Sequence, residues 1–178
     1  SGTPCISDPG SKLVRACIEN DIEVKSIPGA NSIIPAVVLS GFEIKSFYFE
    51  GFIPQKKGRR KVLEEISRRK EMTVLFESPY RIEKLINELN QFCPDREIAL
   101  CRELTKKFEE VIRGKISELR KKINQLKLKG EFVVIIGPDK SWEFFLIDSY
   151  RLRLWVQDTF GIEDRFWVTI NDFNDVRL

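Results

Sequence analysis

The sequence predicts an α/β fold, because apolar segments with strand character alternate with amphipathic helical segments along most of the chain. Pro-Gly and Gly-Pro pairs at residues 28–29 and 137–138 mark turns between such segments. The 178 residues suffice for one domain, or for one domain and part of another. With 42% hydrophobic and 32% charged residues, and no apolar run near the roughly 20 residues of a membrane helix, a soluble protein is expected.

The first 44 residues are predicted to contain two helices and one strand. An Asp-Pro-Gly turn precedes a segment whose apolar residues recur at helical spacing. Alternating Ile22 and Val24 then indicate a short strand, and the Pro28-Gly29 turn leads into an apolar helix with Pro35 in its first turn. The helices are expected at residues 11–20 and 32–39, and the strand at residues 22–27.

Residues 45–138 continue the alternation and are predicted to form a second α/β domain with a mixed sheet. Ser78 and Pro79 are typical of a helix start, with serine at the N-cap and proline at the first helical position. Strands are expected at residues 46–52, 72–76, 97–101, 111–114 and 132–136, and the other helices at residues 59–70 and 116–128.

Residues 139–178 differ in character from the rest of the sequence. All three tryptophans lie there, and the apolar residues show no regular period. We treat this segment as an atypical tail and assign it no role.

The residue content restricts the chemistry that is available. The sequence has no histidine, which removes the commonest general base and every Ser-His or Cys-His nucleophile. Its four cysteines are scattered without a Cys-x-x-Cys pair, so no metal site is expected. Proton transfer must therefore fall to a carboxylate, a lysine, a tyrosine or water.

Basic residues are clustered, although the net charge is only +3. Lys56, Lys57, Arg59 and Arg60 lie on a predicted loop and helix start, where they could bind phosphates without reading sequence. The alternative is an ordinary solvated face, which we prefer for the second basic run at residues 120–129.

Two glutamates, Glu77 and Glu103, each follow a predicted strand, where α/β folds place their binding crevice. Either carboxylate could act as a general base, or could orient a ribose or an ammonium group. The alternative is that each merely caps a neighbouring helix, and the sequence alone leaves both interpretations open.

Six stretches, collinear along the chain, resemble the motifs of the tetrapyrrole methylase superfamily, whose members are class III S-adenosylmethionine-dependent methyltransferases. Within it, they are most similar to the ribosomal RNA small-subunit methyltransferase I branch. Collinear agreement is far more specific than any single motif. The stretches are S-G-T-P-C-I-S-D-P-G at 1–10, P-G-A-N-S at 28–32, F-E-G-F-I-P-Q-K-K-G at 49–58, F-E-S-P-Y-R at 76–81, R-E-L-T-K at 102–106 and K-G-E-F-V at 129–133.

The resemblance implies a tetrapyrrole-methylase-like protein that binds S-adenosylmethionine between two α/β domains and methylates the ribose 2′-hydroxyl of a cytidine in 16S ribosomal RNA. Residues 1–44 would then be the remainder of the cofactor-binding domain. It also implies a homodimer that works on the small ribosomal subunit. A cytoplasmic location is expected because residues 1–10 have neither the basic start nor the apolar segment of a signal peptide. Cofactor contacts are expected at Gly2, Thr3, Pro4, Asn31, Ser32, Phe76, Glu77, Glu103, Leu104 and Thr105, and RNA contacts at Lys56, Lys57, Arg59, Arg60 and Arg81.

The sequence also departs from the family pattern. The first strand and the glycine- and proline-containing loop of the family have no counterpart before Ser1, so an amino-terminally truncated chain with an incomplete cofactor site is expected. Two alternatives stay open: a non-catalytic fragment that dimerises or binds RNA, and a methyltransferase of another superfamily branch. The E-S-P-Y-R and R-E-L-T-K stretches and the basic loop argue against the second.

Overall fold

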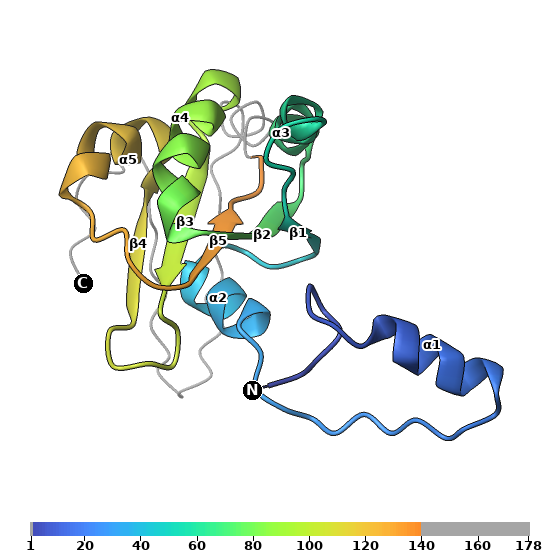
Figure 1. The fold of residues 1–178 in the computed structure, drawn as a ribbon. Helices are drawn as coiled ribbons and strands as arrows, with labels where there is room; N and C mark the ends of the chain where they lie inside the picture. The colour runs from blue at the N-terminus through green and yellow to red at the C-terminus, as the bar shows by residue number, and fades with distance from the viewer. Residues whose placement is uncertain (1, 140–178) are drawn as a thin grey trace, which may run out of the picture. The chain divides into compact units, whose positions relative to one another are not determined.

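The computed structural model describes residues 2–139, which contain a five-stranded mixed sheet of order β1-β2-β5-β3-β4 (Figure 1). β1 pairs with β2 in parallel, and the other three pairings are antiparallel. Because β5 runs antiparallel to both β2 and β3, those two strands point the same way and end at the same edge of the sheet. The strands are β1 (Phe47–Phe52), β2 (Met72–Glu77), β3 (Glu97–Arg102), β4 (Glu110–Lys115) and β5 (Phe132–Ile136).

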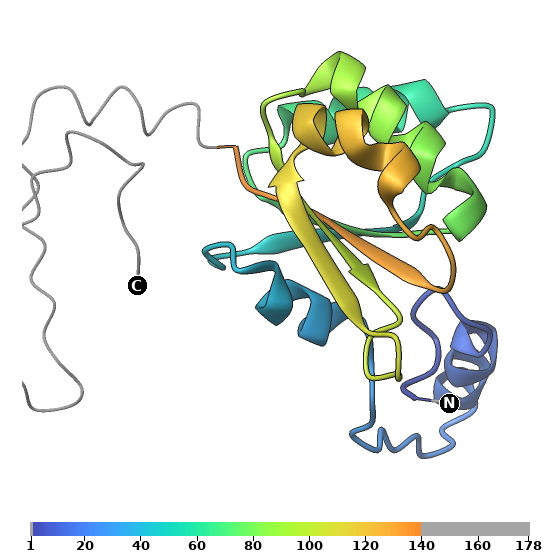
Figure 2. The same ribbon diagram turned by 90° about the vertical axis from the view of Figure 1, so that its left-hand side faces the viewer.

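Helices cover both faces of this sheet, as Figure 2 shows edge-on. α3 (Arg59–Arg68), α4 (Ile82–Phe92) and α5 (Ile116–Lys122) pack on one face, and α2 (Ile33–Ser40) packs on the other. β5 shows the alternation directly, since Val134 and Ile136 join the core under α3, α4 and α5 while Val133 and Ile135 face α2. A strand buried on both faces has to be apolar throughout, which explains the Phe132–Ile136 run.

The predicted mixed sheet and most of the predicted elements are confirmed, with three local differences. The helix expected over residues 116–128 ends at Lys122 and continues as a short 3₁₀ turn, Ile123–Gln125. Leu126 is already extended, and it packs against the core with Leu128 from outside the helix. Tertiary packing therefore decides this helix end.

The start of α4 differs in its capping. Pro79–Arg81 form a 3₁₀ turn ahead of the α-helix, and the Ser78 side chain makes no capping hydrogen bond. Instead the Ser78 N–H donates to Glu77 Oε1 at 2.8 Å. The Glu77 carboxylate thus satisfies the N–H of the cap residue itself, and the Arg81 N–H donates to the Ser78 carbonyl at 2.8 Å.

The strand predicted for residues 22–27 is wrong. α1 (Ser11–Glu19) forms as expected, but residues 22–27 run as exposed chain that pairs with no strand in the described part of the molecule. Ile27 is 83% exposed. An alternating pattern makes a strand only where another strand supplies the hydrogen bonds.

The compact unit that contains the sheet spans Ser1–Asp139. Separate domains at residues 1–44 and 45–138 stay a prediction. The predicted tail, from residue 140 on, lies outside the described residues. Over the part of the chain that is described, no helix has the length and apolar character needed to cross a membrane.

Candidate functional site

The carboxyl ends of β2 and β3 bring two predicted groups of site residues to one edge of the sheet. Glu77 and Arg102 both lie opposite Phe132, the first residue of β5, one from each side. The segments after β2 and β3 therefore flank the start of β5. Since ligands of α/β sheets bind outside the carboxyl ends of the strands, this edge is the candidate site.

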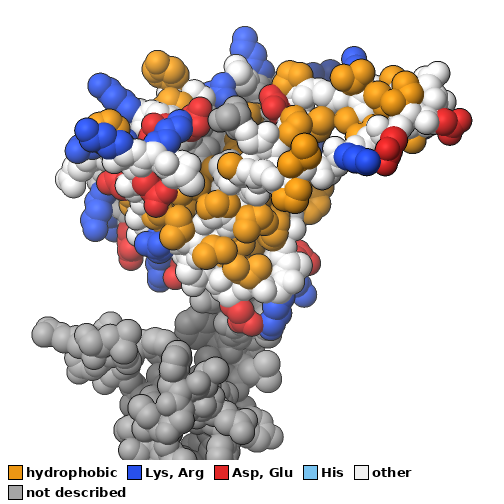
Figure 3. All heavy atoms as spheres, turned by 90° about the horizontal axis from the view of Figure 1, so that it is seen from below, with side chains coloured by type: hydrophobic (Ala, Val, Ile, Leu, Met, Phe, Trp, Pro, Cys, Tyr) orange, Lys and Arg blue, Asp and Glu red, His pale blue; other side chains and the backbone are white. Residues whose placement is uncertain are grey.

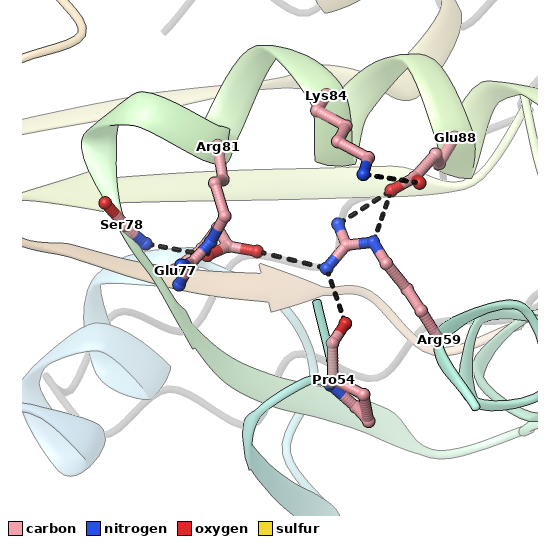
Figure 4. Close-up of polar contacts among 7 residues, drawn as sticks. All are labelled: Pro54, Arg59, Glu77, Ser78, Arg81, Lys84 and Glu88. Atoms are coloured by element: carbon pink, nitrogen blue, oxygen red, sulfur yellow. Dashed lines mark hydrogen bonds and ion pairs between the residues drawn. The ribbon is translucent and has the colours of Figure 1, made fainter. Parts of the chain in front are cut away.

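The Glu77 carboxylate is held at this edge by buried charge partners (Figure 4). Its side chain is 1% exposed. Oε1 accepts hydrogen bonds from the Ser78 N–H at 2.8 Å and from Arg81 Nε at 2.6 Å, and Oε2 lies 3.6 Å from Arg59 Nη1. Two guanidinium groups thus balance one buried carboxylate, as burial of a charge requires.

Arg59, expected on the surface as an RNA contact, lies elsewhere. It is 4% exposed, and its Nε and Nη2 each lie 2.7 Å from Glu88 Oε2. Its Nη1 donates to the Pro54 carbonyl at 3.1 Å. The side chain therefore joins the loop before α3 to both α4 and the end of β2, and it does not point into solvent.

The loop after β3 has an unusual backbone. Glu103 has φ 49° and Thr105 has φ 64°, both in the left-handed region that non-glycine residues rarely adopt. Hydrogen bonds hold this conformation: the Glu103 N–H donates to the Glu131 carbonyl at 3.0 Å, and the Thr105 N–H donates to Glu109 Oε2 at 2.6 Å. Left-handed residues held in this way are found preferentially at functional sites. Leu104, between them, is buried against the α2 side of the core.

The Glu103 carboxylate is tied down by donors from two directions. Its Oε1 accepts the Glu131 N–H at 2.8 Å and Lys106 Nζ at 3.1 Å. The backbone hydrogen bond and then Lys106 hold the pKa of Glu103 below its usual value, so the group is ionised at neutral pH. Gly130 lies against it, at φ 93°, and a Cβ there would approach Glu103 Cγ to 2.5 Å.

The two N-terminal motifs are also brought together. The Thr3 N–H donates to the Ala30 carbonyl at 2.8 Å, and Gly2, at φ 113°, leaves no room for a Cβ beside the same carbonyl. Asn31 Oδ1 accepts the Ile34 N–H at 2.9 Å and so caps α2, while Ser32 makes no capping bond. Pro4 is exposed between the two motifs.

This N-terminal loop passes close to β1. Gly51 has φ 68°, and a Cβ at this position would lie 2.9 Å from Ser7 Oγ. Phe76, at the end of β2, packs between Phe49 and Phe52, with ring centroids 5.3 and 5.4 Å away. The edge therefore has aromatic side chains beside its carboxylates.

The remaining predicted RNA contacts differ in their exposure to solvent. Lys56, Lys57 and Arg60 are exposed, whereas Arg81 is only 28% exposed at its side chain and is paired with Glu77. No set of His, Cys, Asp and Glu side chains within residues 2–139 is arranged to hold a metal ion.

Several residues that support the site were not identified from the sequence. Glu88 is separated from Arg59 by 29 positions, and no local pattern links the two. Gly130 and Glu131 lie in the K-G-E-F-V stretch, which was noted without a role. That stretch was the available signal for their contact with Glu103.

Comparison with known proteins finds one matching family and several similar proteins. The family model described as Tetrapyrrole (Corrin/Porphyrin) Methylases matches residues 1–120. Similar curated proteins include one of Halalkalibacterium halodurans, 41% identical over 80% of this chain, and one of Thermotoga maritima, 39% identical over 77%. Both are named Ribosomal RNA small subunit methyltransferase I.

The chain spans 52% of the first of these relatives and 62% of the second. A third, from Bacillus subtilis, is 39% identical over 80% of the chain, which covers 49% of that protein. The chain therefore matches about half the length of such relatives.

Solved structures show the same fold at low identity. A cobalt precorrin-4 methyltransferase has a TM-score of 0.58 at 14% identity, over 76% of this chain and 61% of its own. A diphthine synthase has a TM-score of 0.58 at 16% identity, over 76% and 57%. A uroporphyrin-III C-methyltransferase from Thermus thermophilus, complexed with S-adenosylhomocysteine, has a TM-score of 0.55 at 14% identity, over 76% and 62%.

Proposed function

The chain belongs to the tetrapyrrole methylase family, and from this premise we propose that it acts as an S-adenosylmethionine-dependent methyltransferase on the ribose 2′-hydroxyl of a cytidine in 16S ribosomal RNA. The resemblance seen in the sequence motifs is confirmed at the level of the family. The names of the relatives that are about 40% identical support ribosomal RNA as the substrate.

The observation that carries the proposal is the shared edge of β2 and β3. Glu77 and Glu103, 26 positions apart in the sequence, flank the start of β5 there. The strained loop of Glu103 and the aromatic packing around Phe76 lie at the same edge. A site of this kind offers polar groups on rigid elements, as small-molecule sites generally do.

The residues at this edge suit an adenosyl group that carries an ammonium. Glu77 Oε2 is buried without a hydrogen-bond partner in residues 2–139, with Arg59 Nη1 still 3.6 Å away. Carboxylates accept hydrogen bonds from ribose hydroxyls and ammonium groups. We assign cofactor contacts to Gly2, Thr3, Pro4, Asn31, Ser32, Phe76, Glu77, Glu103, Leu104 and Thr105.

S-adenosylmethionine supplies an electrophilic methyl group on a sulfonium. The ribose oxygen forms the new bond to that methyl carbon, the carbon–sulfur bond breaks with its electron pair going to sulfur, and the hydroxyl proton is released. The protein's main task is to align oxygen and methyl, and alignment can lower a barrier by about 7–11 kcal/mol in favourable cases.

Within this scheme Glu77 and Glu103 orient rather than accept protons. Glu77 is already paired with two guanidinium groups, and Glu103 has a lowered pKa. A lowered pKa makes the Glu103 carboxylate a weak base, and the carboxylate of Glu77 is engaged by its two ion pairs. Proton release to water is consistent with this assignment.

For RNA binding, we propose Lys56, Lys57 and Arg60 as direct phosphate contacts, because they are exposed. Arg59 and Arg81 contribute by holding Glu77 and the loop that follows Pro54. Charge reversal at the exposed residues should weaken RNA binding and reduce its salt dependence.

A cytoplasmic homodimer completes the proposal. Its support is the apolar surface of α1 and α2, where hydrophobic side chains gather in Figure 3. Leu13 is 70% exposed and Val38 is 65% exposed, which is unusual for helices of a monomer. Val38→Lys should then shift the mass in sedimentation equilibrium from dimer to monomer.

Calorimetric titration with S-adenosylmethionine tests the central claim. We expect saturable binding that S-adenosylhomocysteine competes away, and Glu77→Gln and Thr105→Ala should weaken it. Lys121→Ala, on the exposed side of α5, serves as the control. The absence of any binding heat would favour the alternative of a non-catalytic RNA-binding or dimerising fragment.

A further inference from the structure

A groove lies between the loop before α3, α3 itself and α4, outside the edge described above. Its volume is about 570 Å³, within the usual range of ligand sites. Four cationic side chains line it, together with a single carboxylate, that of Glu88. The cationic residues are Lys56, Arg59, Arg60 and Lys84.

The one carboxylate of the groove is neutralised within it. Glu88 Oε2 lies 2.7 Å from Arg59 Nη2, and Glu88 Oε1 lies 3.9 Å from Lys84 Nζ (Figure 4). Lys56, Arg60 and Lys84 are exposed, and Arg60 also pairs with Glu64 Oε1 at 3.0 Å beyond the groove lining. Because cations outnumber carboxylates four to one in the lining itself, the groove has a positive potential. Such a groove attracts an anionic chain.

The groove also carries groups that suit unpaired nucleotides. Gln55 and Gln91 line it and present amides that can both donate and accept hydrogen bonds. Phe92, half-buried, adds an aromatic surface on which a base can pack. Cations combined with amides and an aromatic ring are typical of surfaces that bind single-stranded nucleic acid.

Arg59 connects this groove to the candidate site. The same guanidinium that pairs with Glu88 in the groove contacts Glu77 at the end of β2, and it bonds to Pro54, next to Gln55. A nucleic-acid strand bound in the groove would thus be separated by one side chain, that of Arg59, from the edge where methyl transfer is proposed.

We infer that the groove between α3 and α4 binds the backbone of a single-stranded RNA segment next to the modified nucleotide. Lys56, Arg60 and Lys84 contact its phosphates, and Gln91 and Phe92 contact an unpaired base. This inference rests on the proposed function for the identity of the RNA.

The test uses a short fluorescein-labelled single-stranded oligoribonucleotide and measures fluorescence anisotropy over a range of salt concentrations. We expect the double variant Lys56→Glu/Lys84→Glu to lose roughly tenfold or more in affinity, with a salt slope smaller by about 1 to 2. The control Lys121→Glu/Lys122→Glu makes the same charge change on exposed residues of α5 outside the groove, and should change affinity by no more than about twofold.

One further variant separates the effect of a direct contact from the effect of the general charge. Gln91→Ala should weaken binding with no change in salt slope, since it removes an uncharged contact. Equal losses in the groove double variant and in its α5 control would overturn the inference, and so would unchanged affinity in the groove variant. Circular dichroism and thermal melting confirm that each variant is folded.

Methyl-donor calorimetry on the same variants keeps the two proposals apart. Loss of RNA affinity with donor binding retained supports both the groove and the proposed function. Loss of RNA affinity in a chain that binds no donor supports the groove and contradicts the proposed function. If the groove variant keeps its RNA affinity, the proposal that the groove binds RNA is contradicted, whether or not the variant binds the methyl donor.

Discussion

The ends of β2 and β3 lie at the same edge of one sheet, yet each holds its glutamate in a different way. Glu77 is buried and is balanced by the side chains of Arg59 and Arg81. Glu103 lies on a strained loop and is balanced mainly by the backbone N–H of Glu131 and by the exposed Lys106. Side-chain packing thus maintains the first carboxylate, and backbone conformation maintains the second.

Two equivalent positions in one sheet therefore need not contribute equally to stability. Removing one partner of a buried ion pair leaves a charge without solvent or counter-ion. Glu103 has 18% of its side chain exposed, so water can partly solvate its charge when a charge partner is removed. Removing a charge partner of Glu77 should therefore cost more stability than removing a charge partner of Glu103.

The largest effect is expected for Arg59→Met, which keeps the aliphatic length but removes the charge shared by Glu77 and Glu88. Glu77 would keep only Arg81 as a charge partner and Glu88 only Lys84, so the loss should cost about 3 kcal/mol in the free energy of unfolding, the low end for a broken buried ion pair. Urea denaturation, followed by far-ultraviolet circular dichroism, measures this loss of stability. Arg60→Met, next in the chain but exposed and paired only with Glu64, should cost no more than about 1 kcal/mol. Equal costs for the two variants would contradict the comparison.

An intermediate effect is expected for Gly130→Ala at the Glu103 side. The added Cβ meets Glu103 Cγ at 2.5 Å in a left-handed backbone, so the cost should be roughly 2–4 kcal/mol. Gly58→Ala is the matched control, because φ there is 85° and no atom lies within 4 Å of the new Cβ. That control should cost only the backbone term of roughly 1–2 kcal/mol. The difference between the two variants in thermal melting measures the contact with Glu103.

The smallest effect concerns pH. The folded pKa of Glu103 is below its ordinary value of 4.5, so its contribution to stability is complete above that pH and is lost as the pH falls through the lower folded value. Lys106→Met should raise the folded pKa of Glu103 and so bring it closer to the ordinary value. The hydrogen bond from Glu131 should keep the pKa partly lowered. Carboxyl-carbon NMR titration measures the change, and an unaltered Glu103 pKa would show that Lys106 is not a partner in solution.

Much of the fold could be predicted because strand and helix periods are local. The Phe132–Ile136 run and the apolar face of α4 needed no knowledge of their neighbours. Residues 22–27 show the limit of this approach, since their alternation had no partner strand among the described residues. The site was predictable in part for the same reason, as a carboxylate after a strand can be read from the chain.

The linear chain is enough to recognise the alternation of elements, the family motifs, the absence of histidine and the two glutamates at strand ends. The folded chain was needed to show that Arg59 is buried, that it pairs with Glu88 and Glu77, and that Gly130 packs against Glu103. These contacts join residues about 20 to 30 positions apart, which local propensity does not encode. Whether a cationic side chain meets a phosphate or a buried carboxylate depends on which elements the sheet brings beside it.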